Sequence, residues 1–171
     1  MRETTDAERF TLFWGGPFSQ WEDSPFISEG VRYTCAEQYM MSEKALFFGD
    51  LEAMAEIMLT RSPARQKAIG RRVRRFDADR WAAASREVVY RGSHAKFTQN
   101  PQLLAALLAT AGTTIVEASP EDPIWGIGLA EDDPRAKQRS AWRGTNWLGE
   151  VLTRLRDNLV AGVHSNPYGP R

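Results

Sequence analysis

The stretch Cys35-Ala36-Glu37-Gln38-Tyr39-Met40-Met41-Ser42-Glu43-Lys44 opens a segment, 36–48, that contains neither glycine nor proline and favours a helix. Seven helical residues advance about 700°, close to two full turns, so Glu37 and Lys44 share one face with two methionines between them. Burial against methionine would raise the pKa of Glu37 and lower the pKa of Lys44, which favours proton transfer near neutral pH. The alternative interpretation is a surface acid and a surface amine that flank a core stripe.

The residues around this helix predict a small amount of β-structure. A β-like run covers 9–14, and the runs 25–28 and 31–34 flank Glu29-Gly30 as a two-residue hairpin turn. A further short strand is expected over 114–118.

Capping residues predict the remaining helices. Their starts are expected at Asp50, at Ser62-Pro63, at Asp77 or Asp79, and at Asn100-Pro101. Gly112 is expected to stop the last of these. An amphipathic C-terminal helix carries apolar residues at helical spacing, namely Leu148, Val151, Leu152, Leu155 and Leu159. The sequence therefore predicts a fold that is mainly α with a small β component.

The length of 171 residues and the mass of 19.3 kDa fit one domain, which we expect over 9–161 between flexible tails at 1–8 and 162–171. No run approaches the ~18 apolar residues that a membrane span needs, and the polar, acidic N-terminus resembles no secretory or transit signal. One cysteine, Cys35, and two histidines exclude a disulfide framework and a Cys/His zinc site. We expect a cytoplasmic protein with no metal and no cofactor.

Charge is balanced overall but unevenly distributed. The chain has 22 basic and 22 acidic residues, yet 1–60 carries 4 basic and 11 acidic side chains while 61–91 carries 10 and 3. The overall balance predicts no strong non-specific binding to nucleic acid. The cluster Arg71-Arg72-Val73-Arg74-Arg75 is a candidate phosphate-binding surface, because guanidinium groups match phosphate geometry. The alternative is a solvated helix face.

A second candidate site lies in the segment 119–144, which contains three prolines and two tryptophans and shows no periodicity. Loops of this length are usually functional or disordered, and the tryptophans argue against disorder. Asp122 lies three residues before Trp125, so a carboxylate would contact a ribose hydroxyl or a developing cation beside an indole face. Gly126 would let a ligand approach the backbone. The alternative is that Trp125 anchors the loop on the core.

Three other residues are candidates for substrate binding. Trp81 stands at a helix start, where it would either stack on a base, worth roughly 1–3 kcal/mol, or belong to the core. Arg143 and Asn146 precede the last helix, where a guanidinium and backbone N–H groups would form an anion site. Asn146 is equally compatible with a plain N-cap.

Three motifs, in this order, resemble those of the NADAR family, also called the YbiA-like family. They are 35–44, Ile124-Trp125-Gly126-Ile127-Gly128-Leu129 and Trp142-Arg143-Gly144-Thr145-Asn146-Trp147-Leu148-Gly149. The likeness runs from about Phe13 to about Leu159. It implies a single compact YbiA-like domain and N-glycosidase activity, a hydrolase function of class EC 3.2.2.-. Members of the family cleave ribosylamino-pyrimidine 5′-phosphates of riboflavin synthesis, or remove ADP-ribose from guanine in modified nucleic acid.

The resemblance also implies residue roles. The functional glutamate of the family falls on Glu37, its helix lysine on Lys44, its pocket tryptophan on Trp81, and its loop aspartate on Asp122 beside Trp125. Glu37 would transfer a proton, Asp122 would hold ribose hydroxyls or the developing charge, and the tryptophans would stack on the base. Lys44 would either attack C1′ or act electrostatically.

The substrate and the class of function have alternatives. The chain has Ala36-Glu37-Gln38-Tyr39-Met40-Met41 where pathway-type bacterial members have Ser-Glu-His-Tyr-Phe-Gln, and its fuller loop motifs resemble eukaryotic and phage-associated members. This favours ADP-ribose on guanine, with Arg143 on a phosphate. A non-catalytic module that binds ADP-ribose or NAD needs neither Glu37 nor Lys44 in a reactive state. A purely structural interaction module would leave 119–144 without a ligand.

Overall fold

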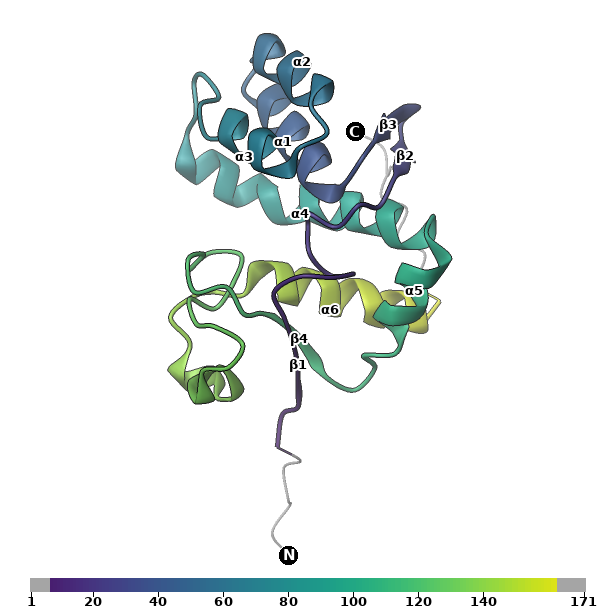
Figure 1. Cartoon of the computed structure of the whole chain (residues 1–171), viewed down its shortest axis with the longest axis vertical. Helices are drawn as coiled ribbons and strands as arrows, with labels where there is room; N and C mark the ends of the chain where they lie inside the picture. Colours follow the sequence, from purple (N-terminus) through teal and green to yellow (C-terminus); the bar gives the residue numbers. More distant parts are fainter. Residues whose placement is uncertain (1–6, 163–171) are drawn as a thin grey trace, which may run out of the picture.

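Four short strands and six α-helices make up residues 7–162, the part of the chain that the computed structural model describes (Figure 1). In chain order they are β1 (Phe10–Phe13), β2 (Phe26–Ser28), β3 (Val31–Tyr33), α1 (Ala36–Phe47), α2 (Leu51–Leu59), α3 (Pro63–Gly70), α4 (Ala78–Thr98), α5 (Pro101–Leu108), β4 (Thr114–Glu117) and α6 (Trp147–Val160). Two 3-10 helices, η1 (Pro134–Lys137) and η2 (Arg139–Ala141), lie between β4 and α6. The predicted fold class, mainly α with a small β component, is confirmed.

The predicted tails lie mostly outside the described residues, which begin at residue 7 and end at residue 162. Glu8 is an exception, because its carboxylate accepts hydrogen bonds from Thr114 at 2.8 Å and from the Arg139 guanidinium at 3.0 Å. The folded part therefore includes residue 8, one residue earlier than the domain start expected from the sequence.

Capping side chains start three helices where the sequence predicts them. Asp50, Ser62 and Asp77 each accept a backbone N–H from the first turn of α2, α3 and α4, at distances of 3.2, 3.4 and 2.9 Å. Asp77 caps α4, and Asp79 lies inside its first turn. The predicted stop at Gly112 is wrong, since α5 ends at Leu108 and the chain continues in tight turns.

The two small sheets differ in how far apart their strands lie in the sequence. β2 and β3 form the predicted hairpin, and Glu29 and Gly30 adopt φ angles of 49° and 79°, as its two-residue turn requires. β1 and β4 pair in parallel, with Phe13 opposite Glu117. This second pairing joins segments about a hundred residues apart, and it was not predicted from the sequence.

The long helix α4 divides the molecule (Figure 1). Helices α1, α2 and α3 lie on one side of it, and α6 lies on the other side with the β1–β4 pair. Gly149 lets α6 approach β4 closely, because a Cβ at that position would collide with the carbonyl oxygen of Ile115. The segment 118–146 leaves β4 and returns to α6.

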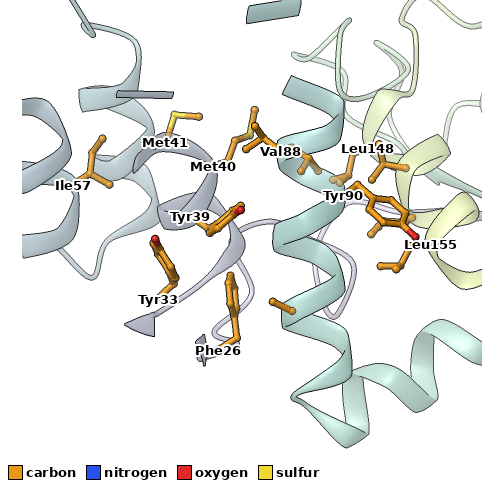
Figure 2. Close-up of a cluster of buried hydrophobic side chains, with 14 of the residues drawn as sticks. Phe26, Tyr33, Tyr39, Met40, Met41, Ile57, Val88, Tyr90, Leu148 and Leu155 are labelled. Carbon is orange, nitrogen blue, oxygen red and sulfur yellow. The ribbon is translucent and has the colours of Figure 1, made fainter. Parts of the chain in front are cut away.

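Helix α1 is covered by neighbouring helices on several faces. Tyr39, Met40 and Met41 are 4–6% exposed, and Figure 2 shows them among core side chains of α2 and α4. Two glycines of neighbouring helices allow this close packing. A Cβ at Gly70 of α3 would overlap the Met41 thioether, and a Cβ at Gly92 of α4 would overlap the Tyr39 ring. The first turn of α1 is therefore held deep in the protein.

We expect Gly92→Ala to lower the free energy of unfolding by about 1–3 kcal/mol, because the added methyl meets a rigid aromatic ring. Urea unfolding followed by circular dichroism measures this change. Gly15→Ala is the matched control, since a Cβ there meets no atom within 4 Å. Equal stability of the two variants would contradict the close packing of α1 against α4.

Candidate functional site

The site is built around Glu37, which lies in the first turn of α1 and is 6% exposed. Burial raises the pKa of its carboxyl to about 7, and nearby Lys67 opposes that rise. The charge of Asp122 raises the pKa further, while Lys44 and Arg71 lower it. The carboxyl therefore titrates close to neutral pH, inside a group of charges contributed by three separate parts of the chain.

Lys44 lies two turns further along the same helix face, as the spacing predicts. Its ammonium nitrogen is 4.3 Å from the centre of the Phe76 ring. Burial lowers the pKa of Lys44, the carboxylate of Glu37 opposes this, and the positive charge of Arg71 adds to it. Both pKa shifts, upward for Glu37 and downward for Lys44, have the predicted sign and the predicted main cause.

Glu117 is a second carboxyl in this group, half-buried and not among the site residues predicted from the sequence. It is the last residue of β4, where its N–H donates to Asn146 at 2.9 Å and its carbonyl accepts from Ile127 at 3.0 Å. Within residues 7–162, its buried Oε2 has no hydrogen-bond partner. Burial raises the pKa of Glu117 to about 7, Asp122 and Glu37 add to the rise, and a lysine opposes it. An acid inside the apolar run 115–118 was the available signal.

Lys67 is the cation that both carboxyls share. It lies on α3 and lowers the pKa of Glu37 and of Glu117. Its ammonium nitrogen also lies 6.0 Å from the centre of the Trp21 ring. In the sequence, Lys67 is only one member of the basic segment 61–91, since nothing local separates it from the arginines around it.

The segment 119–144 brings Asp122 to the site. The Oδ1 atom of Asp122 accepts the N–H groups of Ile124 and Trp125 at 2.9 and 2.8 Å, which fixes the carboxylate at a tight turn. Its charge raises the pKa of both Glu37 and Glu117. The structure therefore brings the three predicted catalytic residues, Glu37, Lys44 and Asp122, into one electrostatic group.

Two predicted substrate-binding residues make structural contacts. Asn146 is completely buried, and its amide accepts from the N–H of Glu117 at 2.9 Å and donates to the carbonyl of Ile115 at 3.0 Å. It occupies the N-cap position of α6 but makes no side-chain cap bond. Gly126 is also buried, and a Cβ there would lie 2.9 Å from the carbonyl oxygen of Asp122. Both residues hold the loop against β4.

The predicted tryptophans differ in exposure. Trp81 is 8% exposed and packs edge-on against Phe47, with ring centroids 5.9 Å apart, which supports the core alternative. Trp125 is half-buried and packs edge-on against Trp147 at 5.7 Å. Trp125 both anchors the loop and keeps part of its surface open to a ligand.

The arginines are mostly engaged in structural contacts. Arg74 pairs with Asp50 at 2.8 Å, and Arg75 donates to the carbonyl of Phe48 at 3.0 Å, so both hold the turn between α1 and α2. Arg71 is the member of the predicted cluster that acts on Glu37 and Lys44. Arg143 is exposed beside the loop and remains a candidate for binding phosphate.

Neither a metal centre nor a membrane helix is found in the described part of the chain. No group of three or more His, Cys, Asp or Glu side chains within 7–162 is arranged to hold a metal ion. Among the same residues, no helix has both the length and the apolar character needed to cross a membrane.

Comparison with known proteins places these features in one family. The NADAR domain model matches residues 4–160. The chain is 43% identical to N-glycosidase R617 of Acanthamoeba polyphaga mimivirus over 145 residues, covering 82% of this chain and 85% of that protein. It is 41% identical to protein irg-1 of Caenorhabditis elegans over 131 residues, covering 75% of this chain and 62% of irg-1, less than two thirds of its length.

Two further similarities extend the comparison. The chain is 33% identical over 134 residues to the chloroplastic riboflavin biosynthesis protein PYRR of Zea mays, covering 74% of this chain and 20% of PYRR. The NMR structure of the Escherichia coli protein YbiA superposes with a TM-score of 0.74 at 28% identity, covering 91% of this chain and 87% of that one. The predicted single YbiA-like domain is confirmed.

We expect Glu117→Gln to make the protein more stable at high pH. Burial raises the pKa of Glu117 to about 7 in the folded chain, whereas the pKa of an exposed glutamate is about 4.5. The stabilisation that comes from holding this proton is therefore full below pH 4.5, falls as the pH rises to about 7, and is absent above that. Relative to wild type, the variant should gain about 2 kcal/mol more at pH 8.5 than at pH 5. Urea unfolding at both pH values measures the difference.

Glu121→Gln is the control for this comparison, because Glu121 is an exposed carboxylate in the same segment. It should change stability equally at the two pH values. An unaltered pH dependence in Glu117→Gln would contradict the raised pKa of Glu117.

Proposed function

The chain belongs to the NADAR family, and we propose that it is an N-glycosidase, a hydrolase that breaks the bond between a ribose C1′ and a nitrogen. The observation that carries the proposal is the buried carboxyl of Glu37 with a pKa of about 7. Such a carboxyl is about half protonated at neutral pH, so it can donate a proton to a leaving nitrogen. The relatives R617 and YbiA, each named an N-glycosidase, support the same class of bond.

The charges around Glu37 suit a transition state that resembles an oxocarbenium ion. As the C1′–N bond breaks, its electron pair moves to the nitrogen, which takes the proton of Glu37. The carboxylate of Asp122 stabilises the positive charge that develops on the sugar. A water oxygen then bonds to C1′ and gives a proton to Glu117, the second carboxyl with a raised pKa.

Two carboxyls with raised pKa values divide this work because they repel each other when both are ionised. The charge of Glu37 raises the pKa of Glu117, and the positive charge of Lys67 lowers the pKa of both carboxyls. One proton shared between the two gives one acid and one base at neutral pH, which is the state that the reaction needs.

Lys44 has two candidate roles. With a lowered pKa, its amine can attack C1′, displace the base and form an imine with the opened sugar, which water then hydrolyses. In the electrostatic role, Lys44 remains an ammonium and holds the substrate through its positive charge. The Phe76 ring 4.3 Å from its nitrogen favours a fixed position in either case.

The favoured substrate is a guanine that carries ADP-ribose in nucleic acid. Trp125 offers an indole surface to a base, while Arg71 and Arg143 supply cations for the phosphates. A ribosylamino-pyrimidine phosphate is the second candidate, because the maize relative is named a riboflavin biosynthesis protein. A non-catalytic module that binds ADP-ribose or NAD is the third candidate. Binding alone does not need a Glu37 carboxyl with a raised pKa.

A hydrolysis assay followed by mass spectrometry separates these candidates. Its two substrates are a guanine-ADP-ribosylated oligonucleotide and a ribosylamino-pyrimidine 5′-phosphate. Cleavage of the first supports reversal of nucleic-acid ADP-ribosylation, and cleavage of the second alone supports removal of the riboflavin intermediate. Stoichiometric binding of ADP-ribose with no turnover of either substrate would contradict the N-glycosidase proposal.

We expect Glu37→Gln to lower kcat by roughly 10²–10⁴-fold while ligand affinity changes little, because an amide cannot donate an acidic proton. The assay above gives kcat, and calorimetry with ADP-ribose gives affinity. Glu56→Gln, at an exposed position on α2, is the control and should keep wild-type activity. Near-native turnover in Glu37→Gln would show that another group supplies the proton.

Borohydride trapping distinguishes the two roles of Lys44. The nucleophilic role predicts a covalent sugar adduct on the wild-type enzyme, which the mass of the reduced protein reveals and which Lys44→Ala abolishes. Lys44→Arg keeps the positive charge, so in the electrostatic role it should keep most of the activity. A trapped adduct that persists in Lys44→Ala would rule out Lys44 as the nucleophile.

A further inference from the structure

Two buried glutamines stand next to charged residues of the site and are not part of the proposed mechanism. Gln38 follows Glu37 in the first turn of α1, and Gln66 precedes Lys67 on α3. Their exposed fractions are 2% and 0%. Burying an amide costs free energy unless its oxygen and its N–H groups find hydrogen-bond partners. The partners of these two amides therefore indicate which segments they hold together.

The Gln66 amide connects the start of α1 with the end of α2. Its Oε1 accepts from the Cys35 thiol at 3.3 Å, and its Nε2 donates to the carbonyl of Thr60 at 2.8 Å. Cys35 is the N-cap residue of α1, and Thr60 is the C-cap residue of α2. One side chain of α3 therefore bonds to the boundary residues of both helices that pack against α3.

The Gln38 amide makes a second connection between the same segments. Its Oε1 accepts from the N–H of Thr34 at 2.8 Å, and its Nε2 donates to the carbonyls of Ile57 and Thr60 at 3.2 and 3.3 Å. The last carbonyls of a helix have no partner within that helix, so this amide supplies donors to the end of α2. The carbonyl of Thr60 is thus the acceptor that Gln38 and Gln66 share.

These bonds fix the part of α3 that carries Lys67. Gln66 and Gly70 lie four residues apart on α3 and so share one face of it. Gly70 packs against the Met41 thioether of α1, while Gln66 bonds to the residue that caps α1. Lys67 lies between these two contacts, and α3 cannot slide along α1 without breaking one of them.

Lys67 extends to the segment that leads into α1. Its ammonium nitrogen lies 6.0 Å from the centre of the Trp21 ring. The neighbouring residue Gln20 accepts the N–H of Glu37 at 2.9 Å through its carbonyl. The positive charge of Lys67 lowers the pKa of Glu37, against the effect of burial. The position of α3 therefore decides how strongly this cation acts on the Glu37 carboxyl.

Glu37 meets charges from several elements packed around it. Those outside α3 are Lys44 of α1, Asp122 of the 119–144 segment and Glu117 of β4. α3 contributes two cations, Lys67 and the C-cap residue Arg71, and both lower the pKa of Glu37. Two of the three cations that act on this carboxyl consequently depend on how α3 is placed.

We propose that Gln66 is a positioning residue of the active site. Through its bonds to Cys35 and Thr60 it holds α3 against the start of α1, and Lys67 is thereby kept at a fixed place near Glu37. Gln66 acts through Lys67 and contacts no reacting group. The proposal rests on the proposed N-glycosidase function, in which Glu37 is the acid. It adds a residue that adjusts this acid from outside the charged group.

Carbon-13 NMR of the glutamate carboxyls tests this role in the free protein, with the Glu37 signal assigned by its loss in Glu37→Gln. Lys67→Met should raise the pH at which Glu37 titrates by about one unit, because it removes a cation that favours the ionised carboxyl. Gln66→Met, which is close to glutamine in size but cannot form the two hydrogen bonds, should raise it about half as far. Gln102→Met, at an exposed glutamine of α5, is the control and should leave it unchanged.

A double variant shows whether Gln66 acts through Lys67. In Gln66→Met/Lys67→Met, the Glu37 carboxyl should titrate at the same pH as in Lys67→Met alone, because the cation that Gln66 positions is already absent. The pH profile of turnover, measured with the substrate that the enzyme cleaves, should move by the same amount in each variant.

Substitutions of Cys35 test the same connection from its other end, and they serve if Gln66→Met does not fold. Cys35→Ser keeps a donor for the Gln66 oxygen, whereas Cys35→Ala removes it. Burial raises the pKa of the Cys35 thiol, so the native side chain is neutral at pH 7 and neither change alters the charge. Cys35→Ala should shift the Glu37 titration upward, and Cys35→Ser should restore it to the wild-type pH.

Three results would overturn the positioning role. An unchanged Glu37 titration in Gln66→Met, with only the free energy of unfolding lowered, would show that the amide is merely structural. A downward shift would show that it acts by keeping water from Glu37. A further upward shift in the double variant would show that it acts independently of Lys67. Failure of the glycosidase function is distinct, because absent N-riboside turnover would leave the predicted NMR shifts in place.

Discussion

The desolvation of Glu37 depends on how tightly α1 is enclosed. Backbones approach this closely only because α3 and α4 present glycines, Gly70 and Gly92, where any side chain would strike α1. The first turn of α1 cannot move outward without opening that packing. The carboxyl there is consequently held away from water, and its raised pKa is a property of the fold more than of any single neighbour.

The other half of the site depends on β4. The parallel pairing of β1 with β4 brings Glu117 to the edge of the site, and the buried amide of Asn146 bonds to β4 in the way an adjacent strand would. This arrangement fixes both ends of the 119–144 segment and so fixes Asp122. Lys67 then balances two carboxyls that come from opposite halves of the chain. A site assembled in this way keeps its charges in place before any substrate arrives.

Local patterns predicted the parts of this structure that short-range physics determines. Caps, the hairpin turn and the shared face of Glu37 and Lys44 all follow from the spacing of a few neighbouring residues. Glu117 and Lys67 acquire their roles only from tertiary contacts. An acid inside the apolar run 115–118 was the one local signal for Glu117, and nothing local distinguishes Lys67 from the arginines around it. Asn146 has the residue type and position of an N-cap, yet its side chain bonds to β4. The first N–H groups of α6 donate instead to the carbonyls of Ile124 and Trp125, so the helix start has partners without a side-chain cap.

The central claim is that burial keeps a catalytic carboxyl half protonated at neutral pH. Carbon-13 NMR of the glutamate side-chain carboxyls, followed from pH 4 to pH 9, tests it directly. Our account predicts that two carboxyl signals titrate near pH 7, and that Glu37→Gln removes one of them and shifts the other downward. If the Glu37 carboxyl titrated near 4.5, like an exposed glutamate, the account of the site would be contradicted.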